Sequence, residues 1–156
     1  IKRKENPDNF AELEALKKFK EAKEIEELET HLLKGKGLYL GTENWPLQAE
    51  SNIITQHFLF KQAWGNHSYD TATLSENSIF KERKDIPAGN TTVSFPMDYR
   101  FKVEAWVADE PLMLSGEISG GKVIIDGGYS RFYCHDQPSN NLEVFEDILN
   151  FLKFTH

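Results

Sequence analysis

The sequence predicts an α/β fold in which helices flank a mostly parallel sheet. Two short apolar runs, residues 37–40 and 123–125, carry this prediction, because parallel strands buried on both faces are apolar along their whole length. Each run opens into a turn of small or polar residues. The third observation is a helical pattern of apolar residues before the first run and after the second.

Composition supports one packed domain. The chain has 156 residues, of which 39% are hydrophobic and 12% aromatic, enough for a substantial core. Its net charge of −7 disfavours binding to nucleic acid or to anionic membranes. No apolar run approaches the roughly 18 residues of a membrane-spanning helix. The single cysteine, Cys134, excludes an internal disulfide and a zinc site with several cysteines, and favours reduced, cytoplasmic surroundings, with an extracellular location left open.

Residues 1–8 are polar, and we expect them to be frayed; residues 9–156 then form the domain. Residues 9–34 are rich in strong helix formers. Their apolar residues recur every three positions, and such a stripe drifts around a helix of 3.6 residues per turn. The spacing predicts either a break near residues 20–23 or one long helix with partners on several sides.

The segment 37–60 reads as strand, turn and helix. Gly35 is a helix C-cap candidate and precedes the strand at 37–40. Residues 41–46 have turn chemistry, and Pro46 suits the first turn of a helix, which we expect from Leu47 onward.

The next segment, about 61–111, reads as an irregular β-rich insertion. Alternation predicts strands near 71–74, 91–95 and 99–107. Strands at 112–117 and 122–126 follow, joined through residues 119–121. An amphipathic helix capped by Asn140 or Asn141 ends the chain.

Two groups of segments resemble a known family: residues 35–41 with Asn52-Ile53-Ile54, and residues 122–132 with the helix 141–152. They are similar to class I glutamine amidotransferase-like domains, and most similar to the non-catalytic relatives found in intraflagellar-transport proteins and beside von Willebrand A-type domains. The resemblance implies a flavodoxin-like parallel sheet and, for those relatives, a ciliary or other cytoskeletal assembly. The family begins with one or two strand–helix units that this chain lacks. We therefore expect a sheet that is incomplete at its N-terminus and a fragment of a longer protein.

The catalytic feature of the family is absent. An active amidotransferase carries its nucleophilic cysteine at the sharp turn after the first strand. Here that turn carries Thr42 and Glu43. Cys134, His135 and Asp136 are consecutive, so their side chains diverge and cannot form a catalytic triad. The sequence therefore favours a non-catalytic protein-binding or scaffolding domain, with no cofactor and no metal, that presents the helical segment 9–34 and the segment 61–111 to a protein partner.

Two sets of candidate residues follow. The alternative function is a hydrolase or a small-molecule-binding domain with a cleft at the carboxyl ends of strands 37–41 and 122–126, where sites form in open α/β sheets. In such a cleft Arg131 would pair with an anionic ligand. The cleft residues are Thr42, Glu43, Asn44, Ser130, Arg131 and His135, and the candidate partner-binding residues are Trp45, Trp64 and Trp106.

Overall fold

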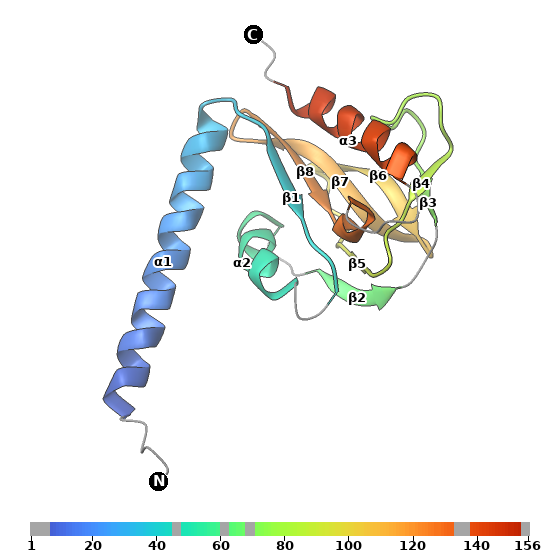
Figure 1. The fold of residues 1–156 in the computed structure, drawn as a ribbon. Coiled ribbons are helices and arrows are strands. Elements are labelled where there is room, and N and C mark those ends of the chain that lie inside the picture. Colours follow the sequence, from blue (N-terminus) through green and yellow to red (C-terminus); the bar gives the residue numbers. More distant parts are fainter. Residues whose placement is uncertain (1–6, 45–47, 60–62, 68–70, 133–137, 154–156) are drawn as a thin grey trace.

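The computed structural model describes residues 7–44, 48–59, 63–67, 71–132 and 138–153. They form three α-helices, eight strands and one 3₁₀ helix (Figure 1). In chain order the elements are α1 (Pro7–Leu33), β1 (Leu38–Gly41), α2 (Gln48–Leu59), β2 (Trp64–His67), β3 (Thr71–Leu74), β4 (Asp85–Pro87), β5 (Thr92–Ser94), β6 (Phe101–Val107), β7 (Glu110–Ile118), β8 (Gly121–Asp126), η1 (Tyr129–Phe132) and α3 (Pro138–Leu152). The expected frayed segment lies almost wholly outside the described residues.

The main sheet is mostly antiparallel, so the predicted parallel flavodoxin-like sheet is wrong and the fold class is α+β. Its six strands run in the order β1-β8-β7-β6-β3-β4 and curl into a half-barrel. Of the strand pairs described in it, β1 with β8 is parallel and the others are antiparallel. β2 and β5 form a separate two-stranded sheet.

Two tight turns explain the antiparallel arrangement. Ala108 and Asp109 join β6 to β7, and Ser119 and Gly120 join β7 to β8. All four residues have positive φ, at 46°, 62°, 52° and 88°. Two successive left-handed residues make the hairpin turn that matches the twist of antiparallel strands. A parallel connection would need a crossover of a dozen residues or more.

The segment 61–111 is part of the fold rather than an insertion into it. It supplies β3, β4 and β6 to the main sheet, and β2 and β5 form the small sheet beside it. The strands predicted near 71–74, 91–95 and 99–107 are present as β3, β5 and β6.

The two faces of the main sheet carry two cores. On one face, Leu32 of α1 and Phe58 of α2 pack with Val123 and Ile125 of β8. On the other face, Val144 and Ile148 of α3 pack with Ile124. The side chains of successive strand residues point to opposite faces, so each apolar run contributes side chains to both cores.

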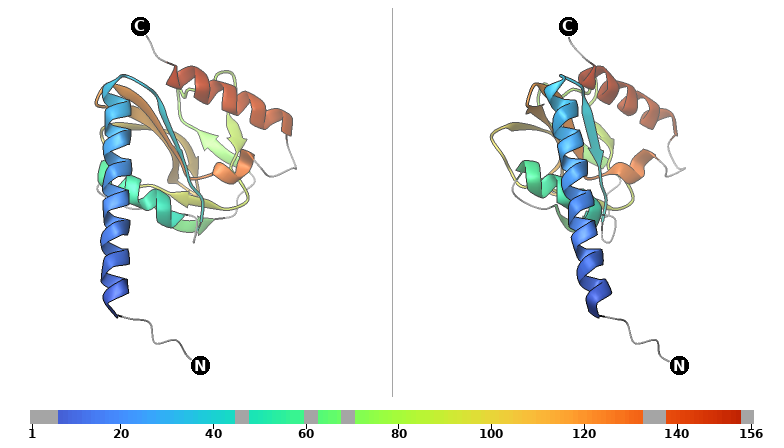
Figure 2. Two further views of the ribbon diagram at one scale, coloured as in Figure 1. Left: turned by 60° about the vertical axis from the view of Figure 1, so that its left-hand side comes forward. Right: turned by 90° about the vertical axis from the view of Figure 1, so that its left-hand side faces the viewer.

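Helix α1 is continuous. Of the two predicted arrangements, the break near residues 20–23 is wrong and the one long helix is present. Lys20 pairs with Glu24 at 3.7 Å and Lys23 pairs with Glu27 at 3.9 Å across the expected break. Such i,i+4 pairs and strong helix formers support a helix without packing. The drifting apolar stripe is tolerated because, among the α1 side chains from residue 14 onward, Leu32 near the C-terminal end is the buried one. The earlier turns extend past the body, as Figures 1 and 2 show.

Candidate functional site around strand β1

The structure brings together the carboxyl ends of β1 and β8, where the sequence predicts a cleft. Thr42 N donates to Asp126 O at 2.8 Å, and Tyr129 N donates to Thr42 O at 3.2 Å. The turns after the two strands are therefore fastened to each other by main-chain hydrogen bonds. Five of the six predicted cleft residues lie in or beside these turns: Thr42, Glu43, Asn44, Ser130 and Arg131.

Arg131 is fully buried and paired. Its guanidinium forms an ion pair with Asp126, and both side chains are completely inaccessible to solvent. It also donates to Pro87 O at 2.7 Å and to Ala88 O at 3.2 Å. Because a buried charge is tolerated only when it is paired and hydrogen-bonded, this arrangement is what a structural arginine requires. It ties β8 to β4 across the sheet.

The other predicted cleft residues form local contacts. Ser51 Oγ donates to Thr42 Oγ1 at 2.6 Å, which joins the start of α2 to the turn after β1. Ser130 Oγ donates to Thr91 O at 3.2 Å. Glu43 is buried and Asn44 is half-buried. His135 lies outside the described residues. The cleft stays a prediction.

Sequence reasoning missed Tyr39 and Asp126, which hold this region together. Tyr39 Oη donates to Asp126 Oδ2 at 2.7 Å, and Gly128 N donates to Asp126 Oδ1 at 2.9 Å. Burial, aided by the negative charge of Asp126, raises the pKa of Tyr39 well above its ordinary value. The available signal was an aspartate that directly follows a buried apolar run, where an unpaired charge is not tolerated.

The structure describes two of the three predicted tryptophan sites. Trp45 lies outside the described residues. Trp64 is exposed on β2, whereas Trp106 is half-buried on β6 and donates its Nε1 hydrogen to Ser75 Oγ at 2.7 Å. Among the residues that the structure describes, no three histidine, cysteine, aspartate or glutamate side chains gather as they would around a metal ion.

An apolar surface lies beside β1 on the α3 face of the sheet, and we call it the apolar shelf. Its residues are Leu142, Phe145 and Leu149 of α3 and Tyr129 of η1, with exposed fractions of 60%, 43%, 45% and 44%. The α3 residues fall on one flank of the helix, because their spacing is three and four.

Aromatic rings connect the shelf to β1. The ring of Phe145 packs edge-on against Phe132 with centroids 5.7 Å apart, and Phe132 packs in the same way against Tyr39 at 6.2 Å. The ring centroids of Tyr129 and Tyr39 are 6.5 Å apart. A Cβ on Gly41 would lie 2.7 Å from the ring of Tyr129 and 2.9 Å from that of Tyr39, so only glycine lets both rings pack over the strand.

A groove lies beside β1 on the opposite face, between α1 and α2. Its volume is about 460 Å³. Leu40 and Gly41 of β1 line it together with Ile25 of α1 and Ile53 and Ile54 of α2. Its remaining walls are polar: Lys17, Lys20, Glu21, Glu24 and Ser51.

Comparisons with known proteins give the fold alone. No protein-family model and no curated protein sequence matches the chain. Two solved structures are similar: cytoplasmic protein STM3548 from Salmonella typhimurium (12% identity, TM-score 0.61) and cytoplasmic protein STM1381 from Salmonella typhimurium LT2 (14% identity, TM-score 0.52). The similarity covers 84% and 83% of this chain. The chain spans 61% and 60% of theirs, so both neighbours are considerably longer than the matched region.

These similarities correct the resemblance drawn from sequence. The fold that they share with this chain is built on a curled, mostly antiparallel sheet, whereas an amidotransferase-like domain requires a doubly wound parallel sheet. The quoted segments matched because an apolar strand followed by a small-residue turn is common to both architectures. None of the described helices combines the length and the apolar character that crossing a membrane requires.

Proposed function

We propose that this chain is a non-catalytic protein-binding domain, belonging to a larger protein or complex, and that the apolar shelf is its contact surface. The observation that supports it is the exposure of three large apolar side chains on one flank of α3, next to an exposed tyrosine. Single exposed apolar residues are ordinary, but a contiguous group of them on a folded domain marks an interaction site. The proposal includes a cytoplasmic location, because both structural neighbours are named as cytoplasmic proteins.

The charges around the shelf indicate the chemistry of the partner. Every charged residue within α3 is acidic: Glu146, Asp147 and Glu143, the last of which pairs with Arg83. Acidic side chains on the helix that carries the shelf repel phosphate groups, which disfavours an anionic lipid surface or a nucleic acid. The partner that fits is a protein with an apolar contact surface and basic residues around it.

The alternative of a ligand cleft at the strand ends draws less support from the geometry. Arg131 was the residue expected to pair with an anionic ligand, and its guanidinium is used by Asp126 and by two main-chain carbonyls. A ligand that took these donors would leave Asp126 charged and buried without its partner, which is costly.

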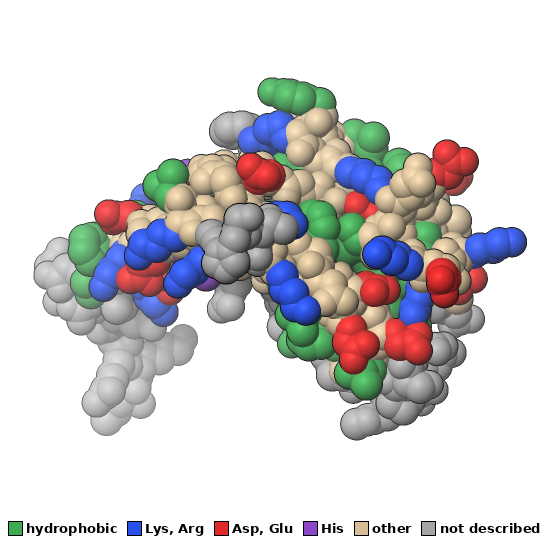
Figure 3. All heavy atoms as spheres, turned by 90° about the horizontal axis from the view of Figure 1, so that it is seen from above, with side chains coloured by type: hydrophobic (Ala, Val, Ile, Leu, Met, Phe, Trp, Pro, Cys, Tyr) green, Lys and Arg blue, Asp and Glu red, His purple; other side chains and the backbone are tan. Residues whose placement is uncertain are grey.

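Helix α1 offers a second surface of the kind expected from sequence. Leu16 and Phe19 are 64% and 72% exposed on the turns that extend past the body. Figure 3 shows hydrophobic side chains at the surface of α1 among intermixed basic and acidic ones. This pair is smaller than the shelf and lies on a helix without other support, so we assign it a secondary role.

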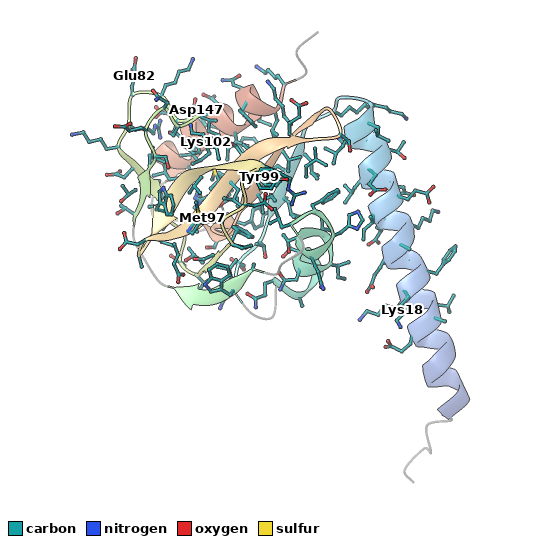
Figure 4. The ribbon with its side chains drawn as sticks, turned by 180° about the vertical axis from the view of Figure 1, so that it is seen from behind. Lys18, Glu82, Met97, Tyr99, Lys102 and Asp147 are labelled. Carbon is teal, nitrogen blue, oxygen red and sulfur yellow. The ribbon has the colours of Figure 1, made fainter. Side chains whose placement is uncertain are left out.

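The proposal is tested with a matched pair of substitutions, Leu142→Glu and Met97→Glu. Both side chains are well exposed, at 60% and 66%. Met97 lies on the loop before β6, with Tyr99, on the side of the molecule seen in Figure 4. Proteins that co-purify with the chain from its source are identified, and the affinity of each purified partner is measured by calorimetry for the wild type and for both variants.

Leu142→Glu is expected to weaken binding by roughly tenfold or more, because it places a charge in an apolar contact, and Met97→Glu by less than about threefold. Neither substitution should lower the free energy of unfolding by more than about 0.5 kcal/mol, since both sites are exposed. If no purified partner distinguishes the two variants, the shelf is not the contact surface.

A further inference from the structure

We propose that the outer edge of β1 takes up an extended segment of a partner protein as an additional strand of the sheet. This inference rests on the proposed protein-binding function and specifies which part of the partner is bound, and how. It is drawn from three properties of β1: its outer main-chain groups, which have no strand partner among the described residues, the chemistry of its side chains, and the surfaces on either side of it.

The main chain of β1 is paired on one side. β1 ends the sheet order, and within the described residues its strand partner is β8. Main-chain groups of successive strand residues point alternately to the two sides, and Thr42 N donates to Asp126 O. By this alternation Leu38 and Leu40 direct their N–H and C=O groups to β8, while Tyr39 and Gly41 direct theirs to the outer edge. Such groups are a template for another strand.

The side chains of β1 lack the features that protect a sheet edge. Natural proteins block exposed edges with charged residues, proline or very short strands. β1 reads Leu-Tyr-Leu-Gly, with no charge and no proline, and all four residues are half-buried. The other edge strand, β4, has only three residues, Asp-Ile-Pro, and carries both a charge and a proline. Of the two edges that the structure describes, β1 therefore has the composition more open to pairing.

A strand added to β1 would have a surface for each set of its side chains. Successive side chains point to opposite faces of a sheet. On one face they would meet the apolar shelf and the rings of Tyr39 and Tyr129; on the other they would enter the groove between α1 and α2. Main-chain bonds with pockets for alternate side chains are the geometry of strand addition.

The same surfaces define the occupant. It is an extended segment with apolar or aromatic residues at every second position, facing the shelf. The intervening residues face Ile25 and Ile54 and the mixed charges of Lys17, Lys20, Glu21 and Glu24, so long polar side chains with apolar stems suit them. A helix has no free main-chain groups to offer the edge, and therefore does not fit.

The experiment uses peptides. A displayed library of random twelve-residue peptides is selected against the whole chain, and the tightest binder is synthesised with one N-methyl group at each position in turn. N-methylation removes a main-chain donor and leaves the side chains in place. We expect losses of about tenfold or more at every second position and less than about threefold between them, because only alternate N–H groups bond to β1. Amide exchange at Tyr39 and Gly41 should slow on binding.

A matched pair of tyrosine substitutions serves as the control. Tyr129→Ser removes a ring beside β1 and should weaken the peptide by about tenfold, whereas Tyr99→Ser, at a 98% exposed side chain on the loop before β6, should leave its affinity unchanged. A peptide that depends on Leu142 without the two-residue pattern would support the protein-binding shelf and overturn strand addition. A selection that yields no peptide protecting these two amides overturns it as well.

Discussion

The two edge strands of the main sheet are both short, but they differ in charge, in proline content and in their surroundings. β4 is short, charged and proline-containing, and Arg131 fixes the carbonyls of Pro87 and of the next residue, Ala88. β1 is apolar and half-buried, with the apolar shelf on one face and the groove between α1 and α2 on the other. If β1 binds a partner strand as proposed, stability and interaction are divided between the two ends of one sheet. At one edge Arg131, held by Asp126, bonds to the carbonyls of Pro87 and Ala88. At the other edge, the outer main-chain groups of β1 have no strand partner among the described residues.

The largest expected effect comes from a substitution that releases the edge strand β4. Arg131→Met keeps much of the side-chain volume but leaves Asp126 charged and buried without its partner, and it frees two carbonyls. We expect a loss of about 3–5 kcal/mol in the free energy of unfolding, measured by urea denaturation. The matched variant Arg83→Met removes an ion pair with Glu143, whose carboxylate is largely exposed, and should cost about 1 kcal/mol or less. Equal losses for the two variants would show that the buried pair does not lock β4.

A smaller loss of stability is expected when the hydrogen bond between β1 and the carboxylate of Asp126 is removed. Tyr39→Phe removes the hydroxyl that donates to Asp126 Oδ2, and should cost about 1.5–3 kcal/mol, the usual range for a hydrogen bond to a charged group. The comparison is made by urea denaturation at pH 8. A loss close to zero would mean that Asp126 does not anchor β1.

The pH dependence of the same variant gives a second check. Burial raises the folded-state pKa of Tyr39 above the unfolded value of about 10. The stability that this shift contributes is therefore fully present below pH 10 and is lost as the pH rises above it. Tyr39→Phe should lose less stability than the wild type between pH 9 and about 11. Identical losses for the two proteins would contradict the buried, neutral tyrosine.

The sequence predicted local elements well and their assembly poorly. The apolar runs at β1 and β8, the helix after Leu47 and the strands near 71–74, 91–95 and 99–107 are present, because hydrophobic periodicity is a local property. The predicted parallel direction of the strands was wrong, although Ser119-Gly120 is a hairpin turn that requires the two strands it joins to be antiparallel. Burial of the runs on both faces was read as a sign of parallel pairing. In fact the curled sheet and helices on both faces bury antiparallel strands equally well.

The candidate site was predicted in part. Thr42, Ser130 and Arg131 do gather at the ends of β1 and β8, as expected for strands that are parallel neighbours. The hydrogen-bond partners of Arg131 could not be predicted from sequence. Besides Asp126, they are main-chain carbonyls more than forty positions away in the chain. The shelf was hidden as well, since the stripe of α3 reads as core in sequence, and only the structure shows which flank of the helix the sheet leaves uncovered.

The most direct test of the open edge is amide hydrogen exchange along β1 in the free chain, followed by NMR. We predict that Tyr39 and Gly41 exchange at least about 100-fold faster than Leu38 and Leu40, because opening is needed to expose only the second pair. Equal protection of all four amides would mean that another part of the chain covers the outer edge of β1, and it would contradict the central claim that this edge is free to bind.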